Sequence, residues 1–205
     1  GDSSLPLKRG GDGGAAKGSG VWAVTFDSRL HPSCDLENAK QAAKELGGIH
    51  VILPVDELEM EEIRHNPVNR CYLCKKHLFL SLKKFAKEKG VSALAEGTNE
   101  DDLHAYRPGI QAVQELGIRS PLAEAGLTKE EVRQLADRLG ISVAYRPSTP
   151  CMATRLPYGT PLDYEVLKKI EDGEEILRRR IGGNVRLRLH GDVVRIEADR
   201  ERFQE

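Results

Sequence analysis

The chain has 205 residues and a formal net charge of −1; 39% of its residues are hydrophobic and 31% are charged. This composition indicates a soluble globular protein long enough to bury a core, and its near-neutral charge gives no bulk attraction to nucleic acid or to an anionic membrane. The longest apolar runs, 49–55 and 91–95, are too short to span a bilayer, and no signal peptide opens the chain. Four cysteines at this length do not resemble a secreted disulfide scaffold, so we expect a protein of the reducing cytoplasm.

The first residues, Gly1-Asp2-Ser3-Ser4, look like the end of a phosphate-binding motif. An Asp-Ser pair that enters a helix offers hydroxyl and backbone N–H groups to a phosphate. A frayed terminus is the equal alternative.

Residues 1–144 show alternating strand and helix patterns. The predicted strands are Val21–Phe26, Ile49–Val55, Val91–Ala95 and Ile141–Ala144. The predicted helices are one capped by Asp35, a short exposed one within 56–64, one that follows a cysteine pair and ends at Gly90, and one that starts at the capping box Thr128-x-x-Glu131. This alternation predicts an α/β fold with a parallel, doubly wound sheet. Such sheets bind ligands at the carboxyl ends of strands, where this chain places Asp27-Ser28 and Gly97-Thr98-Asn99.

Residues 145–205 follow a different pattern, so we place a domain boundary near Ala144. A helix at about 163–180 precedes two short strands, 185–189 and 193–198, whose alternation predicts a hairpin with one polar face. Arg186 and Arg188 share that face and can bind an anion together. A solvated charged face is the commoner alternative for such a pair.

Three of the four cysteines lie in two unusual places. Cys151 is in the loop 146–160, where three prolines fix the backbone and where Thr154 and Arg155 can hold an anion beside the thiol. Cys71-x-x-Cys74 opens a helix next to Arg70, Lys75 and Lys76, cations that favour thiolates. We expect the two places to meet in the fold.

Two thiolates are too few for a closed metal or cluster site, whereas Cys151 makes three and leaves one position open. The alternative is two buried helix cysteines and an unrelated loop thiol. Cys34, in a His-Pro-Ser-Cys turn, is interpreted as an ordinary loop cysteine.

Together these residues resemble the LarE family of ATP-dependent sulfur transferases, within the PP-loop pyrophosphatase superfamily. The matching stretches cover nearly the whole chain in the family's order: GDSSL, AVTFDS, NPVNRCYLCKKHLF, EGTNEDDLHAYRPG, SPLAEAGLTKEEVRQLADRLG, CMATRLPYGTP and VRLRLHGDVVRIE. The resemblance implies a Rossmann-like adenine nucleotide α-hydrolase (PP-loop) fold for residues 1–144 and a small catalytic and substrate-binding domain for residues 145–205. The family's first strand and the Ser-Gly-Gly that leads its PP-loop have no counterpart in this sequence.

The resemblance also implies a reaction. ATP, with Mg²⁺, adenylates a carboxylate of pyridinium-3,5-biscarboxylate mononucleotide and releases pyrophosphate, because the acyl-adenylate can release AMP where a carboxylate would have to release oxide. Sulfur from sulfide or another donor then displaces AMP, and two rounds give the precursor of the nickel-pincer nucleotide of lactate racemase. We assign the ATP contacts to Asp2, Ser3, Asp27, Ser28, Gly97, Thr98 and Asn99.

Two versions of the family differ in their sulfur centre. In one, a lone cysteine gives up its own sulfur and is left as dehydroalanine. In the other, three cysteines hold a 4Fe-4S cluster whose open iron carries an extra sulfide. Cys71, Cys74 and Cys151 match all three positions, so we favour the cluster version. For the substrate, the resemblance implies contacts from Thr154, Arg155, Glu174, Arg186, Arg188 and Glu197, and it implies a homo-oligomer.

Three other functions stay open. A tRNA thiolase also pairs a PP-loop with cysteines, but RNA binding relies on a basic surface that the composition does not predict. An amide-forming PP-loop ligase uses ammonia and needs no cysteines. A zinc-stabilised nucleotide-binding module would hold metal without catalysis.

Overall fold

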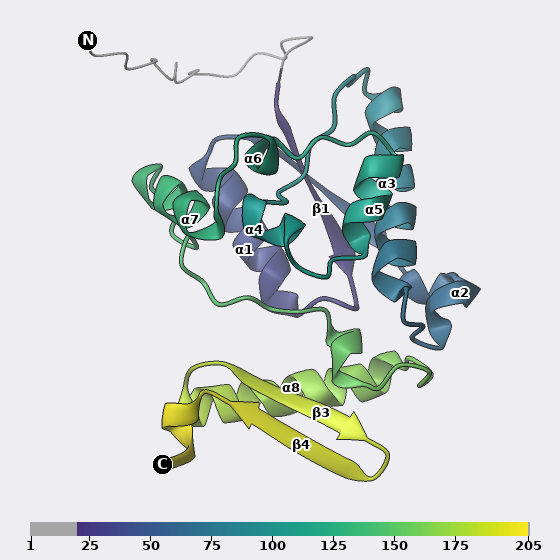
Figure 1. Cartoon of the computed structure of the whole chain (residues 1–205), viewed down its shortest axis with the longest axis vertical. Helices are drawn as coiled ribbons and strands as arrows, with labels where there is room; N and C mark the ends of the chain where they lie inside the picture. The colour runs from purple at the N-terminus through teal and green to yellow at the C-terminus, as the bar shows by residue number, and fades with distance from the viewer. Residues whose placement is uncertain (1–19, 205) are drawn as a thin grey trace.

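The structure is a computed structural model that describes residues 20–204. The predicted ATP contacts Asp2 and Ser3 lie outside the described residues. In Figure 1 an upper body of helices surrounds β1, and a lower body consists of α8 and a hairpin.

The upper body is built on two parallel strands joined by a helix. β1 (Trp22–Ser28) pairs with β2 (Ile49–Val55), with Trp22 opposite Ile49 and Ser28 opposite Val55. The connection is α1 (Ser33–Glu45). Both strands were predicted from their apolar, β-prone sequences, and both predictions are confirmed.

Short elements and two packed helices complete this body. α3 (Arg70–Glu88) packs against α5 (Gly109–Glu115), and Phe79 and Leu82 of α3 meet Val113 of α5 and Ile118 in a core that also contacts β1. The helices of this region are η1 (Glu57–Glu59), α2 (Glu61–Arg64), α3 (Arg70–Glu88), α4 (Glu100–Leu103), α5 (Gly109–Glu115), α6 (Pro121–Glu124), α7 (Lys129–Arg138) and η2 (Met152–Arg155). The predicted capping box at α7 is confirmed. The Glu131 backbone N–H donates to the Thr128 hydroxyl, and the Thr128 backbone N–H donates to the Glu131 carboxylate.

Two predicted strands are wrong, so among the described residues the parallel sheet has two strands. The segment 91–95 contributes one isolated parallel bridge, between Ala95 and Arg119. The segment 141–144 is a turn that closes α7, with the Ile141 N–H bonded to the Ala136 carbonyl. The sequence pattern of both segments predicts a strand, but neither segment has a neighbouring strand along its whole length.

Two smaller predictions also need correction. Asp35 does not cap α1, since Pro32 holds the cap position; Asp35 instead bonds Arg146 and Thr149. The acidic stretch 56–64 is not uniformly exposed, because Glu57 is completely buried.

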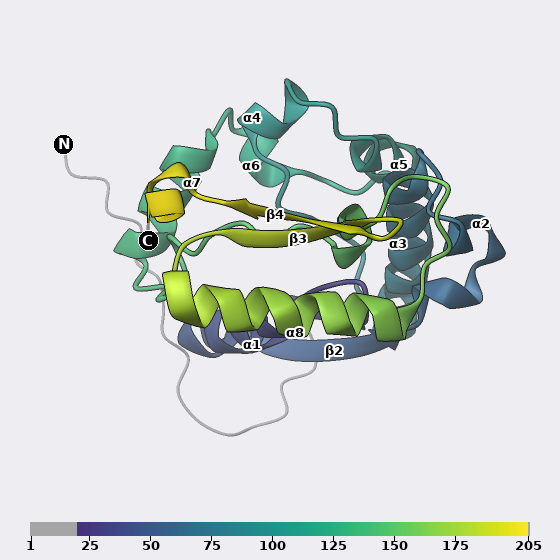
Figure 2. The ribbon, with the colours of Figure 1, turned by 90° about the horizontal axis from the view of Figure 1, so that it is seen from below.

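The lower body matches its prediction. α8 (Tyr164–Ile181) is capped by Asp163, and β3 (Val185–His190) pairs with β4 (Val193–Ala198) in an antiparallel hairpin before η3 (Arg200–Gln204). Figure 2 shows the hairpin lying along α8. Gly191 takes a positive φ of 61° in the two-residue turn, as tight hairpins require.

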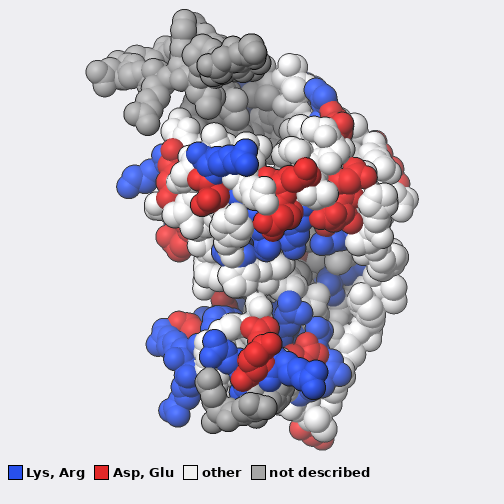
Figure 3. All heavy atoms as spheres, turned by 60° about the vertical axis from the view of Figure 1, so that its left-hand side comes forward, with Lys and Arg blue, Asp and Glu red and all other residues white. Residues whose placement is uncertain are grey.

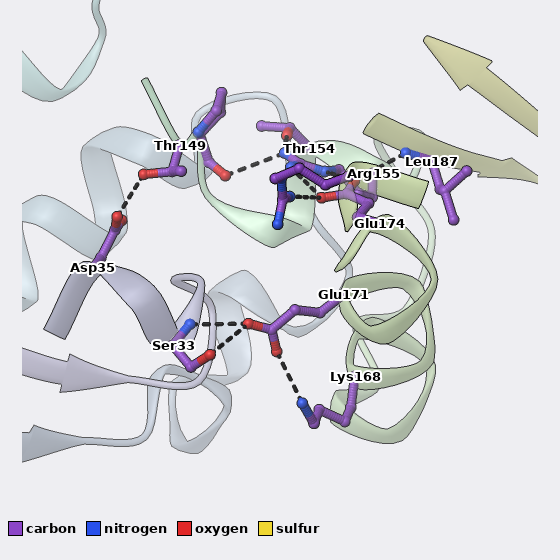
Figure 4. A network of polar contacts seen from close by, with 11 residues as sticks. Ser33, Asp35, Thr149, Thr154, Arg155, Lys168, Glu171, Glu174 and Leu187 are labelled. Atoms are coloured by element: carbon purple, nitrogen blue, oxygen red, sulfur yellow. Dashed lines mark hydrogen bonds and ion pairs between the residues drawn. The ribbon is translucent and has the colours of Figure 1, made fainter. Parts of the chain in front are cut away.

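A second hydrophobic core joins the two bodies. Leu30 and Ile63 pack with Met152, Leu167 and Ile170, so residues on both sides of the predicted boundary near Ala144 share it. Polar contacts add to this junction: Glu171 of α8 accepts from the backbone and hydroxyl of Ser33 at the start of α1 (Figure 4). The boundary itself stays a prediction.

None of the described helices has the length and apolar character that crossing a bilayer requires.

Candidate active site

Three cysteines line a single cavity of about 540 Å³. Cys71 and Cys74 come from the first turns of α3, and Cys151 comes from the loop just before η2. The next residue in that loop, Met152, donates its backbone N–H to the Leu30 carbonyl at 2.7 Å, which fixes the loop against the chain that follows β1. The structure therefore brings the two cysteine-bearing segments together. We call this space the thiol cavity.

Asn66 holds the Cys151 loop against the start of α3. Its side chain is completely buried, and its amide donates to the carbonyls of Ala153, Leu156 and Pro157. Its amide oxygen accepts from Arg70, which is 3% exposed. The φ of Asn66 is 49°, a left-handed conformation that asparagine tolerates better than most residues. One side chain thus sets the loop and the Arg70 guanidinium in place together.

Two of the three thiols, those of Cys74 and Cys151, are partly buried. Burial raises the pKa of Cys74 to about 12, and burial also raises the pKa of Cys151, although Arg70 opposes both shifts. The neighbouring cations were expected to favour thiolates, but burial outweighs their effect on the pKa. Two of them are bonded to other groups, Lys75 to Glu96 and Lys76 to Tyr72 and Glu115. In the metal-free protein the buried thiols hold their protons, and coordination would displace them.

This donor set, three thiols that line one cavity, is of the kind that holds an iron–sulfur cluster. Among the described residues, no three His, Cys, Asp or Glu side chains are placed to hold one metal ion. Cys71 is exposed while Cys74 and Cys151 are partly buried, which gives the cavity an open side. The buried Arg70 guanidinium, 3.8 Å from the Cys71 sulfur, would offset part of the charge of three thiolates.

A larger cavity of about 880 Å³ adjoins the thiol cavity at the carboxyl end of β1. Asp27, Ser28 and Gly97, three of the predicted ATP contacts, line it. Thr98 lines the thiol cavity instead, and the Asn99 side chain caps α4. We call this space the strand-end cavity. The residues that line both cavities are His31, Lys75, Leu78, Glu96 and Gly97.

Glu96 organises the wall between the two cavities. Burial alone would raise its pKa, but hydrogen bonds from Ser120, Thr98 and Lys75 together lower it. The bond from Lys75 is 2.9 Å long. Glu96 was assigned no role from the sequence; its place directly before the predicted ligand contact Gly97 was the available signal.

A third cavity, of about 360 Å³, is lined by cations and lies on the other side of the Cys151 loop. Of the predicted substrate contacts, Thr154, Arg155 and Arg188 line it, and Arg70 lines both it and the thiol cavity. Figure 3 shows many Lys and Arg side chains over the lower body, with some Asp and Glu among them. The basic residues of this lining that were not predicted as substrate contacts are Arg70, His190 and Arg195.

The remaining predicted substrate contacts are placed elsewhere. Arg186 and Glu197 line a separate hollow, so the two hairpin arginines share a face without sharing a cavity. Glu197 also accepts from Arg188 at 2.7 Å. Glu174 points from α8 to Arg155 (Figure 4), where the two side chains form a buried, two-pronged ion pair of 2.7 and 2.9 Å.

Comparison with known proteins finds relatives over the whole chain and over part of it. The pyridinium-3,5-bisthiocarboxylic acid mononucleotide synthase of Lactiplantibacillus plantarum is 33% identical over 202 residues, covering 98% of this chain and 72% of the relative. An uncharacterized protein of Synechocystis sp. is 39% identical over 204 residues, covering the whole chain and 75% of the relative. The tRNA-specific 2-thiouridylase of Rickettsia africae is 29% identical over 143 residues, 56% of this chain and 39% of the relative. No family model matches the chain.

The fold is mixed α/β with parallel strands, and it carries a site of three cysteines. Together with these relatives, this places the chain in the PP-loop class, which includes sulfur-transferring enzymes. Within that class, the chain belongs to the LarE family, that of the pyridinium-3,5-bisthiocarboxylic acid mononucleotide synthases.

Proposed function

We propose that this protein is an ATP-dependent sulfur transferase of nickel-pincer nucleotide biosynthesis. It would adenylate a carboxylate of pyridinium-3,5-biscarboxylate mononucleotide and replace the AMP by sulfur. The observation that carries the proposal is the convergence of Cys71, Cys74 and Cys151 on one cavity that Arg70 also lines. The relationship to a protein named as the synthase supports the same substrate class.

The cavities suggest how the reactants are arranged. ATP with Mg²⁺ would occupy the strand-end cavity, where Asp27, Ser28 and Gly97 line the wall. The substrate phosphate would bind in the cation-lined cavity, since clustered guanidinium groups bind phosphate strongly. The reacting carboxylate would then extend past Arg70 toward Cys151. A bound 4Fe-4S cluster on the three cysteines would supply sulfide for repeated transfer.

The chain's own residues set the geometry of that transfer. Asn66 fixes the loop and Arg70 places a positive charge beside the thiols, where it would hold the carboxylate until it is adenylated. The buried pair of Arg155 and Glu174 braces the loop from below, because Arg155 also donates to the Pro150 carbonyl at 3.1 Å. These contacts would hold the reacting groups in line before the chemical step.

The test is an anaerobic assay of the full-length protein with ATP, Mg²⁺, sulfide and the pyridinium biscarboxylate mononucleotide. We expect pyrophosphate release and a thiolated product by mass spectrometry. Cys151→Ala should abolish the product, whereas the control Thr128→Ala, at the cap of α7, should not. A protein that releases pyrophosphate only with tRNA, and thiolates the tRNA, would refute the proposal. Product formation that stops at one sulfur per protein chain, with Cys151 converted to dehydroalanine, would show that Cys151 gives up its own sulfur and that no cluster supplies it.

A further inference from the structure

A buried carboxyl group lies behind the thiol cavity without enough partners. Glu57, the first residue of η1, is completely buried, and its Oε2 atom has no hydrogen-bond partner among the described residues. Burying an incompletely bonded carboxyl group costs free energy and adds nothing to packing that an apolar residue would not add. Burial raises the pKa of Glu57, and the hydrogen bond from Ser28 offsets this only in part. Glu57 is therefore suited to taking up and releasing a proton.

Glu57 is the inner end of a hydrogen-bonded chain. The Ser28 hydroxyl donates to the Glu57 Oε1 atom, and the same hydroxyl oxygen lies 3.1 Å from His31 Nδ1. It also accepts from the Leu30 N–H at 3.1 Å, which fixes its position. Because the one hydroxyl proton points to Glu57, the hydrogen bond between His31 and Ser28 must be donated by Nδ1, and in a neutral ring Nε2 then keeps its lone pair. If Glu57 takes up a proton, the donor and the acceptor of each hydrogen bond between Glu57, Ser28 and His31 can exchange roles.

The outer end of this chain is at the junction of the two reaction cavities. His31 follows β1 and lines both the strand-end cavity and the thiol cavity. The charged residues that line both cavities with His31 are Lys75 and Glu96, which pair with each other at 2.9 Å. Arg70, Asp102 and Arg107 also line the thiol cavity. In addition to burial, Asp56 raises the pKa of Glu57, and Glu57 in turn raises the pKa of Cys74, Cys151 and Tyr164. His31 is thus the group beside both cavities that can exchange a proton without breaking an ion pair.

We propose that His31 carries the proton in the sulfur-transfer step, with Ser28 and Glu57 as the positioning residues that relay it. This rests on the proposed function. Hydrosulfide, HS⁻, attacks the acyl-adenylate carbonyl carbon; the C–S bond forms, and the C–O bond to AMP breaks with its electron pair on the phosphate oxygen. The S–H proton passes to His31 Nε2, the Nδ1 proton passes to Ser28, and the Ser28 proton passes to Glu57. The products are a thiocarboxylate, AMP and protonated Glu57.

The test uses His31→Ala in the full-length protein, with His104→Ala as the control, because His104 is exposed and contacts Glu100 outside both cavities. Pyrophosphate release and thiolated product are measured in the same anaerobic reaction. We expect His31→Ala to lower the thiolation rate by about 10²–10⁴-fold, the usual contribution of a proton-transfer group, while pyrophosphate release continues and acyl-adenylate accumulates. Added imidazole should restore part of the rate, more so at higher pH. His104→Ala should match the parent.

Glu57→Gln and Ser28→Ala separate a relay from a purely structural role. Both should slow thiolation less than His31→Ala does, since His31 can still exchange its proton with water, and both should change the pH profile of the thiolation rate. A parent that forms no thiolated product refutes the proposed function and the relay together. An active parent matched by His31→Ala refutes the relay alone. A loss confined to pyrophosphate release, or a defect in His31→Ala that imidazole does not relieve, also refutes it.

Discussion

The buried pair of Arg155 and Glu174 gives the sharpest stability prediction. The two side chains are 3% and 2% exposed, and they make two charged hydrogen bonds of 2.7 and 2.9 Å. Glu174 also accepts from the Leu187 backbone N–H at 2.9 Å, which links α8 to β3. Removing the carboxylate charge leaves a guanidinium buried without its counter-ion. We therefore expect Glu174→Gln to lower the free energy of unfolding by about 3–5 kcal/mol, the usual cost of breaking a buried pair.

A matched control lies next to it on the same helix. Glu175 pairs with Arg179, but these side chains are 49% and 76% exposed, so water already solvates both charges. Glu175→Gln should cost no more than about 0.5 kcal/mol, as for exposed pairs one turn apart. The measurement is urea unfolding followed by circular dichroism, with both variants compared at equal slope. Equal costs for the two variants, or a cost below about 1 kcal/mol for Glu174→Gln, would refute the argument from burial.

Three further predictions follow from single side chains. Asn66→Ala and Asn66→Gly both remove the hydrogen bonds to the Cys151 loop, but only glycine accepts the φ of 49° without strain. Urea unfolding should therefore show the alanine variant to be less stable than the glycine variant by about 1 kcal/mol, and the reverse order would contradict this. Thr128→Ala should cost about 1 kcal/mol in the same assay through the lost cap of α7, and it should leave thiolation unchanged. Burial raises the pKa of Glu57, so its ionised carboxylate destabilises the folded protein; this destabilisation is absent below the ordinary pKa of 4.5 and grows as pH rises above it. The free energy of unfolding of Glu57→Gln relative to the parent should therefore increase above pH 4.5. A constant difference across the pH series would show that Glu57 does not titrate with folding.

The elements that could be predicted from sequence are those with local signals. The capping box at Thr128 and the alternation of Val185, Leu187 and Leu189 determine α7 and the hairpin almost without help from the rest of the chain. The segments 91–95 and 141–144 have the same apolar character as β1, but strand formation needs a partner, and partners are a property of the whole fold.

The site shows the same division. The three cysteines were marked by their unusual surroundings in the sequence, and the structure brings them to one cavity. The relay was not visible, because Glu57 sits in an acidic stretch typical of an exposed helix and only tertiary packing buries it. His31 could have been suspected from its place three residues after the carboxyl end of a buried strand.

The central claim is that Cys71, Cys74 and Cys151 form one sulfur-transfer centre. Its most direct test is anaerobic reconstitution with iron and sulfide, followed by iron and sulfide counts and an optical spectrum for the parent and the three cysteine-to-alanine variants. Cys34→Ala, on α1 at the strand-end cavity, is the control. The account predicts about four irons per chain in the parent and the control, and a loss in each of the three variants. Iron retained after removal of any one of the three, or absent from the parent, would contradict it.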